Sequence, residues 1–173
     1  MLDVITIISE TTPRAFVRQS LDSVRVAANL ASFDVSCIRA PGVPGHIGQA
    51  LREGLNRSSA PWVCFVDDDD FVLPNAFECL AGAFASEPAA ICARELHLFA
   101  NGYLTPARRR HHLTVYRADV AQRLPLQRMP NFTPFIGHAQ AAARGLIVDV
   151  LNWVYVYRRR LSAGLQVRAQ HHG

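Results

Sequence analysis

Lysine is absent from this 173-residue sequence, so all eighteen basic residues are arginines. No apolar stretch approaches the ~20 residues that a membrane-spanning helix requires. The N-terminus also lacks a basic segment followed by an apolar core and a small-residue cleavage site, the pattern of a secretory signal. These absences predict a soluble, cytoplasmic protein without a transmembrane segment.

Cysteine is sparse and is not arranged in pairs. The four cysteines, Cys37, Cys64, Cys79 and Cys92, are widely separated, and the last three lie in apolar segments. None of them has the close spacing of paired metal ligands. The sequence therefore favours buried, free thiols over a zinc site or disulfide bonds.

Carboxylates are scarce in the second half of the chain. Through Glu95 there are 7 arginines against 12 acidic residues, a net charge of −5, whereas from Leu96 onward there are 11 arginines against 2, a net charge of +9. The basic half predicts an anionic partner, such as the phosphates of a nucleotide-linked substrate, an acidic acceptor or a nucleic acid.

Four consecutive aspartates, Asp67 to Asp70, follow the apolar run 62–66. Adjacent carboxylates repel one another unless a cation or a strong set of hydrogen-bond donors lies among them. A bound hard ion such as Mg²⁺ or Mn²⁺ is the simplest way to reduce this repulsion. An ion held by two carboxylates also keeps coordination positions open for substrate phosphates. A solvated acidic turn is the alternative.

The length fits one domain, in which strands and helices alternate. Strands are predicted at 4–8, 33–38, 62–66 and 90–93, with further strand patterns near 113 and over 146–157. Helices are predicted over 47–55, from Pro74 to about Ala85, and after Thr12 and Pro13, where a capping hydroxyl precedes a proline at the first helical position. Trp153, Tyr155 and Tyr157 alternate as strand residues do, so we expect them in the core on one face.

This alternation is typical of a parallel sheet covered by helices on both faces. In such a sheet, ligands bind outside the carboxyl ends of the strands. Because the four aspartates follow a predicted strand directly, we interpret them as a metal or nucleotide site rather than as a solvated turn.

Several segments resemble one enzyme family. An opening strand, VITIIS, leads to a helix carrying RAFVRQSLDSV, and GHIGQALREGLNRSSAPWVCFVDDDDFVLPNAFECL supplies a glycine loop, helix, strand, acidic motif and proline-led segment in order. LTVYRADVAQRLP and GLIVDVLNWVYVYR resemble an acceptor-side strand and helix and the closing strands. The chain is thus similar to the nucleotide-sugar-dependent glycosyltransferases of family 2. The resemblance implies an α/β, GT-A (Rossmann-like) fold over 1–173, with a nucleotide- and metal-binding half (1–95) and an acceptor-side half (96–173).

The resemblance also implies a D-x-D motif, formed by Asp67 with Asp69 or by Asp68 with Asp69. One carboxylate would lie near the nucleotide ribose and the other would bind the Mn²⁺ or Mg²⁺ that bridges the diphosphate. We expect Asp69 to be the metal ligand and Asp67, Asp68, Arg39 and Ser9 to contact the nucleotide; an exposed arginine is the alternative for Arg39. A cation stabilises the charge that develops on the departing diphosphate.

Two positions depart from the family pattern. Where members carry an acidic residue after the second strand, residues 37–40 read CIRA. The sequence therefore does not identify the nucleotide of the donor. Where inverting members carry a catalytic carboxylate, residues 135–140 read FIGHAQ. His138 occupies the matching place, and an ordinary histidine pKa of about 6.5 suits a general base. A metal or phosphate contact and a structural role are the alternatives for His138.

The acceptor-side half offers few other candidates. His111 and His112 follow Arg108 to Arg110, which predicts a solvated basic loop that could also clamp a diphosphate or an acidic acceptor. Asp119 begins a predicted helix, where capping is favoured over catalysis.

We therefore predict a small, metal-dependent glycosyltransferase that moves a hexosyl or related group from a nucleotide sugar to a saccharide, protein or other acceptor, with inversion implied by the resemblance. One alternative is a non-catalytic nucleotide- or sugar-binding protein of the same fold. The other is a nucleic-acid-binding or nucleic-acid-modifying protein, favoured by the sequence pI of about 9.2 and by the arginine runs at Arg108 and Arg158, although no recognised nucleic-acid motif supports it.

Overall fold

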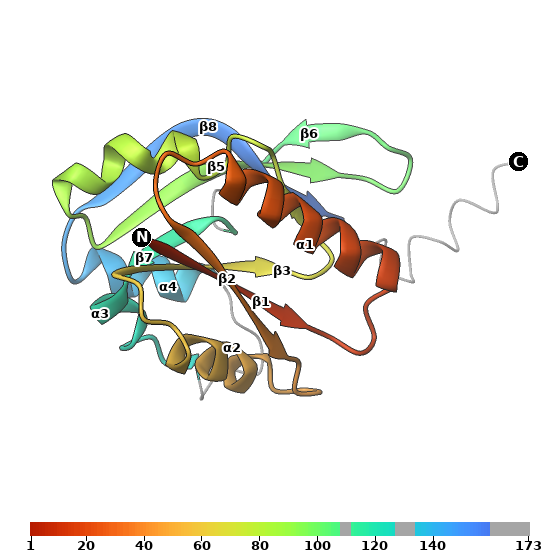
Figure 1. Cartoon of the computed structure of the whole chain (residues 1–173), viewed down its shortest axis with the longest axis horizontal. Helices are drawn as coiled ribbons and strands as arrows, with labels where there is room; N and C mark the ends of the chain where they lie inside the picture. The colour runs from red at the N-terminus through yellow and green to blue at the C-terminus, as the bar shows by residue number, and fades with distance from the viewer. Residues whose placement is uncertain (108–111, 127–133, 160–173) are drawn as a thin grey trace, which may run out of the picture.

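A single sheet of eight strands forms the centre of the molecule in the computed structural model, which describes residues 1–107, 112–126 and 134–159 (Figure 1). Seven strands follow one another across the sheet: β2 (Val35–Pro41), β1 (Leu2–Ile8), β3 (Trp62–Asp67), β7 (Thr114–Arg117), β5 (Ala90–Leu98), β8 (Ile147–Arg158) and β4 (Phe71–Val72). The eighth strand, β6 (Leu104–Pro106), pairs with β5. Strands from both halves of the chain therefore belong to one sheet.

The strand directions confirm an α/β fold with a mostly parallel sheet. β1 is parallel to β2 and β3, and β5 is parallel to β8. β7 is antiparallel to both β3 and β5, so β5 and β8 point the same way as β1, β2 and β3. The short strands β4 and β6 run in the opposite direction, and the sequence pattern does not predict either of them.

Successive residues of β3 point to opposite faces of the sheet, as the two-residue period of a strand requires. Trp62, Cys64 and Val66 belong to one core cluster, whereas Val63 and Phe65 belong to a second. Other elements must therefore pack on each of the two faces of β3.

Helices cover both faces, as predicted (Figure 1). Helix α1 (Arg14–Asn29) and the 3₁₀ helix η1 (Glu78–Ser86) contribute Val24, Ala27 and Leu80 to the first cluster. Helix α2 (Ile47–Asn56) contributes Leu51 and Leu55 to the second cluster, to which α3 (Ala118–Ala121) and α4 (Pro134–Ala142) also contribute.

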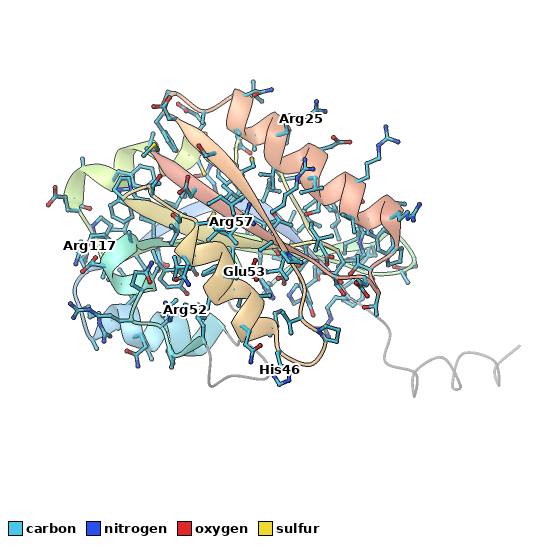
Figure 2. The ribbon with its side chains drawn as sticks, turned by 60° about the horizontal axis from the view of Figure 1, so that its bottom comes forward. Arg25, His46, Arg52, Glu53, Arg57 and Arg117 are labelled. Atoms are coloured by element: carbon cyan, nitrogen blue, oxygen red, sulfur yellow. The ribbon has the colours of Figure 1, made fainter. Side chains whose placement is uncertain are left out.

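Helix α2 lies at the front in Figure 2, where Arg52 points from it toward the neighbouring α3. The Arg52 guanidinium donates to the carbonyl oxygens of Gln122 (3.0 Å) and Leu124 (2.5 Å). This contact joins the first half of the chain to the segment after α3.

Two predicted helix starts are wrong. The N-cap of α1 is Pro13 and has no capping side chain, because the Thr12 hydroxyl donates to Asp68 instead. The segment after Pro74 forms turns before η1 begins at Glu78, and the amide of Leu73 donates to the Val154 carbonyl at 2.8 Å. Contacts with distant residues thus decide the local structure at both places.

Two side-chain predictions need correction. Cys64 and Cys92 are buried and Cys79 is half-buried, but Cys37 is exposed because it lies on the edge strand β2; no disulfide bond joins any two of these four described residues. Of the three alternating aromatic residues of β8, only Tyr155 is fully buried, and its neighbours Val154 and Val156 are buried as well. β8 is therefore covered on both faces at this point.

No helix in the described part of the chain is long and apolar enough to cross a membrane.

Candidate functional site

The four aspartates form a turn at the carboxyl end of β3. Asp67 is the last residue of β3, and its carbonyl accepts the amide of Asp70 at 3.2 Å. Asp67 also pairs with Ile7, so the turn lies beside the end of β1. The structure thus places residues 67–70, the aspartate turn, at the carboxyl end of the parallel strands, where sheets of this kind bind ligands.

The second aspartate is directed into the protein. Asp68 is only 6% exposed, and its carboxylate accepts the Ser9 amide at 2.6 Å and the Thr12 hydroxyl at 3.0 Å. Asp68 thereby fixes the loop between β1 and α1 against the aspartate turn.

The fourth aspartate is held by the last strand. Asp70 is 1% exposed and accepts the Tyr155 hydroxyl at 2.8 Å and the Arg158 amide at 2.7 Å. Burial, followed by the negative charge of Asp67, raises the pKa of Asp70 to about 7, although both hydrogen bonds favour the ionised form. The buried carboxyl group is thus poised between its two protonation states near neutrality.

Arg158 connects the aspartate turn to α1. Its Nε donates to the Asp69 carbonyl at 2.8 Å, and a terminal nitrogen donates to Gln19 at 2.6 Å. The guanidinium carbon lies 4.0 Å from the ring centroid of Phe16. One member of the second arginine run is therefore engaged inside the molecule rather than presented to a nucleic acid.

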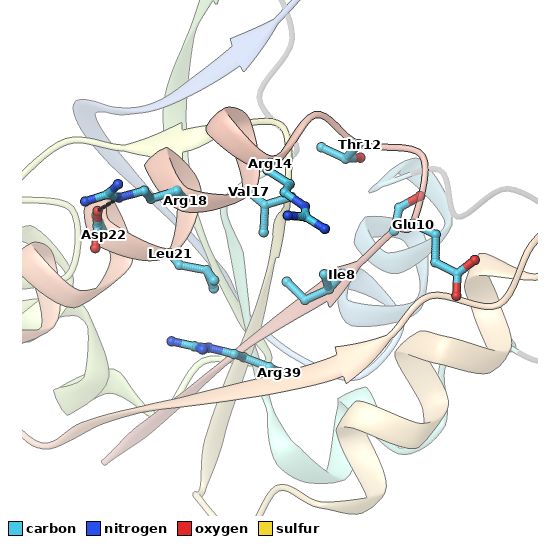
Figure 3. A pocket seen from close by; sticks show the side chains of 10 residues that line it. Ile8, Glu10, Thr12, Arg14, Val17, Arg18, Leu21, Asp22 and Arg39 are labelled. Carbon is cyan, nitrogen blue, oxygen red and sulfur yellow. Dashed lines mark ion pairs between the residues drawn. The ribbon is translucent and has the colours of Figure 1, made fainter.

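A pocket of about 650 Å³ lies between α1 and β2, beside the loop that follows β1 (Figure 3). Its lining comes from the end of β1 and the following loop, from α1 and from β2: Ile8, Ser9, Glu10, Thr12, Arg14, Val17, Arg18, Leu21, Asp22 and Arg39. Ser9 and Thr12 line this pocket and also donate to Asp68, so the pocket and the aspartate turn share a wall.

The pocket combines apolar and cationic surface. Ile8, Val17 and Leu21 supply the apolar part, while Arg14 from α1 and Arg39 from β2 enter from opposite sides (Figure 3). Glu10 and Asp22 also line the pocket, so its surface carries both signs of charge; Arg14 and Arg39 suit the negatively charged part of a ligand, and the apolar side chains suit a weakly polar part.

The predicted site residues fall into two groups. Ser9 and Arg39 line the pocket, and Asp67, Asp68 and Asp69 belong to the adjoining aspartate turn. The backbone of His138 lies in α4, which packs on β5 and β7, but its side chain is outside the described residues, as are Arg108 to Arg110 and His111.

The sequence did not reveal a second polar cluster around Glu95. This carboxylate, 4% exposed, interacts with His112 Nδ1 at 2.7 Å and with His97 Nε2 at 3.2 Å. Burial lowers the pKa of His112, but the hydrogen bond and charge of Glu95 together with the charges of Asp67 and Asp70 outweigh it, so the pKa is raised. A carboxylate two residues after the apolar run 89–93 was the signal available in the sequence.

Among the described residues, no group of three His, Cys, Asp or Glu side chains is arranged to hold a metal ion. Asp67 and Asp69 are partly exposed and supply only oxygen atoms, the ligand type of Mg²⁺ and Mn²⁺. Two carboxylates fit an ion whose other ligands are water and substrate phosphate.

A family model described as glycosyl transferase family 2 matches residues 19–149. No curated protein sequence matches the chain. The fold is similar to that of S. aureus TarS, with a TM-score of 0.67 at 12% identity over 91% of this chain and 36% of TarS.

Two structures of S. aureus TarS 1-349 are also similar. The complex with UDP has a TM-score of 0.67 and the complex with UDP-GlcNAc a TM-score of 0.61; both are 12% identical, and they cover 91% and 95% of this chain. The chain spans 36% to 60% of the length of these structures. Their likeness shows a shared α/β fold.

Proposed function

Because the chain belongs to glycosyl transferase family 2, whose model matches more than half of it, we propose that it transfers a sugar from a nucleotide-sugar donor to an acceptor. The observation that carries this proposal is the common wall of the pocket and the aspartate turn. Asp68 joins them through Ser9 and Thr12, so one elongated ligand can occupy both.

The base and ribose of the donor would occupy the pocket, with the diphosphate at the aspartate turn. Asp67 would lie near the ribose, and Arg39 or Arg14 would contact a phosphate. Asp68 would contribute by positioning Ser9 and Thr12, since its carboxylate is buried against them. The contacts that the sequence predicted for Ser9, Arg39 and Asp67 thus form one continuous donor site in this proposal.

Asp69 would hold Mn²⁺ or Mg²⁺. When bound, the ion neutralises the negative charge that develops on the departing diphosphate. The protein prepares this site by fixing the backbone of Asp69 through Arg158 and by burying Asp70 beneath the turn. The two carboxylates can then face the ligand without rearrangement of the strand ends.

Uridine diphosphate is the donor nucleotide to test first, because S. aureus TarS 1-349 forms complexes with UDP and with UDP-GlcNAc. Residues 37–40 lack the acidic residue typical of the family, so GDP, CDP and dTDP belong in the same panel. The acceptor is a saccharide, a protein or another hydroxyl-bearing molecule in the cytoplasm. The net charge of +9 after Glu95 favours an anionic acceptor.

Inversion at the sugar carbon is proposed from the family resemblance. The resemblance also makes His138, in α4, a candidate for the general base in place of the usual carboxylate. A protein of the same fold that binds a donor without turnover is the alternative, and the altered sequence at Gly137 and His138 favours it.

The test is a thermal-shift measurement with each nucleoside diphosphate, with and without Mn²⁺, since a ligand that binds only the native state raises its melting temperature. We expect a metal-dependent rise with one nucleotide. The absence of a rise with all four would contradict the proposal. Binding followed by no sugar transfer or hydrolysis would favour the non-catalytic alternative.

A further inference from the structure

The polar cluster around Glu95 lies at the same end of the sheet as the aspartate turn. Val115 pairs with Cys64 of β3, and Thr114 pairs with Cys92 of β5. Because β7 runs antiparallel to both strands, His112, two residues before Thr114, lies beyond these pairs toward the carboxyl ends. His112 and Glu95 thus lie at the same end of the sheet as the aspartate turn.

Glu95 holds the His112 imidazole in one orientation. Oε2 of Glu95 accepts the His112 amide at 3.1 Å and faces Nδ1 of the ring at 2.7 Å. The ring stacks on Tyr157, with centroids 4.5 Å apart and planes 17° apart. With Nδ1 engaged, Nε2 points to the opposite edge of the ring, and the His112 side chain is 24% exposed.

One residue separates this imidazole from the aspartate turn. His112 stacks on Tyr155 at a centroid distance of 5.5 Å, and the Tyr155 hydroxyl donates to Asp70 and accepts the amide of Asp67 at 3.4 Å. Register shifts in the pairing of β5 with β8 lie on both sides of Arg94, next to Glu95. Irregularities of this kind re-aim side chains and are frequent beside active sites.

We propose that His112, positioned by Glu95, is the general base that activates the acceptor. A carboxylate on Nδ1 fixes the tautomer whose Nε2 can accept a proton, the arrangement on which many hydrolases rely. The inference depends on the proposed glycosyl transfer and assigns removal of the proton to His112 in place of His138, the candidate from the family resemblance.

The step balances without a further reactant. Nε2 of His112 takes the proton of the acceptor hydroxyl while the acceptor oxygen forms a bond to the anomeric carbon of the sugar. The bond between that carbon and the diphosphate breaks, and the diphosphate leaves with the electron pair. The imidazolium, stabilised by Glu95, then releases its proton to solvent.

The charged and titratable groups around His112 give this base a distinct pH dependence. Glu95 from β5 and Tyr155 and Tyr157 from β8 contact it, and Asp67 and Asp70 act on it from farther away. Because burial lowers the pKa of His112 but the carboxylates raise it further, activity should rise with pH through a pKa above that of an ordinary histidine. Glu95→Gln should move this ascending limb to lower pH.

The experiment compares His112→Asn, which keeps a donor near the position of Nδ1, with His138→Asn and with His46→Asn, an exposed control on the loop before α2 (Figure 2). Release of UDP from a panel of UDP-sugars with Mn²⁺ is measured, with water as acceptor, alongside the thermal shift caused by UDP. We expect His112→Asn to lower kcat by about 10²-fold or more while the UDP shift is unchanged, and His46→Asn to match the wild type.

Four results would overturn the assignment to His112. These are unchanged turnover in His112→Asn, an unmoved pH profile in Glu95→Gln, a loss of turnover confined to His138→Asn, and a wild-type protein that binds UDP but releases none from any donor. A wild-type protein that binds no nucleoside diphosphate would instead contradict the proposed function itself, and the assignment to His112 with it.

Discussion

The acidic half and the arginine-rich half of the chain meet at the aspartate turn and contribute different things to it. The first half supplies the four carboxylates, the pocket and the partners of Asp68, whereas the second half supplies Tyr155 and Arg158, which hold the Asp70 carboxylate and the Asp69 carbonyl. His112, also from the second half, stacks on Tyr155, whose hydroxyl donates to Asp70 of the same turn. The proposed ligand contacts and part of their support thus come from different halves of the chain, within one sheet.

The largest expected effect of breaking this division between the two halves is at Asp69. Asp69→Asn removes a negative ligand from the turn but keeps its shape, so we expect the Mn²⁺-dependent part of nucleotide binding to disappear. Thermal shift with UDP, with and without Mn²⁺, measures it. Asp34→Asn is the matched control, because Asp34 is exposed and precedes β2 at the opposite end of the sheet. Equal Mn²⁺-dependent shifts in the two variants would remove Asp69 from the metal site.

Arg158 tests the support that the second half gives. Arg158→Ala loses the hydrogen bonds to the Asp69 carbonyl and Gln19 and the contact with Phe16, but keeps the amide bond to Asp70. We expect the free energy of unfolding to fall by about 1–2 kcal/mol, because the guanidinium is only partly buried. Nucleotide affinity should weaken as well.

Urea denaturation and a UDP titration measure these two effects. The exposed Arg159 provides the control Arg159→Ala, which also removes one positive charge. If both variants behaved alike, the effect would come from net charge and the supporting role of Arg158 would be wrong.

The smallest expected effect concerns the protonation of Asp70. Its folded pKa of about 7 lies above the ordinary carboxyl value, so between these two values the folded protein holds a proton that the unfolded chain releases. This contribution to stability is present at low pH and is lost as the pH rises through about 7.

Without metal, lowering the pH from about 8 to about 5 should therefore stabilise the wild type by roughly 1 kcal/mol or more relative to Asp70→Asn. Denaturation curves across this range measure the difference in slope. Parallel pH profiles for the two proteins would show that Asp70 is ionised throughout.

Local sequence was sufficient to predict much of the fold. The apolar run 62–66 identified β3 and therefore the position of the aspartates, and the alternation of elements identified the parallel strands β1, β2 and β3. Thr12 was misassigned as a helix cap because its partner, Asp68, is 56 residues away in the sequence.

The cluster around Glu95 escaped prediction for a similar reason. His112 follows Glu95 by 17 residues, and only the β5–β7 pairing brings the two together. β4 has two residues, too few for a periodicity, and owes its existence to pairing with β8. The sequence thus predicts structure that depends on neighbouring residues, whereas the orientations of Asp68 and Asp70 depend on residues far away in the chain.

The anchoring of Asp70 by β8 also has a consequence for synthesis of the chain. Its two partners follow it by 85 and 88 residues, so the ribosome must add most of the second half before this carboxylate can be satisfied. The β1–β2–β3 unit can assemble earlier, because its strands are close in sequence. A nascent chain would therefore carry an acidic, solvent-exposed turn until β8 docks, and formation of the proposed donor site would be among the last events of folding.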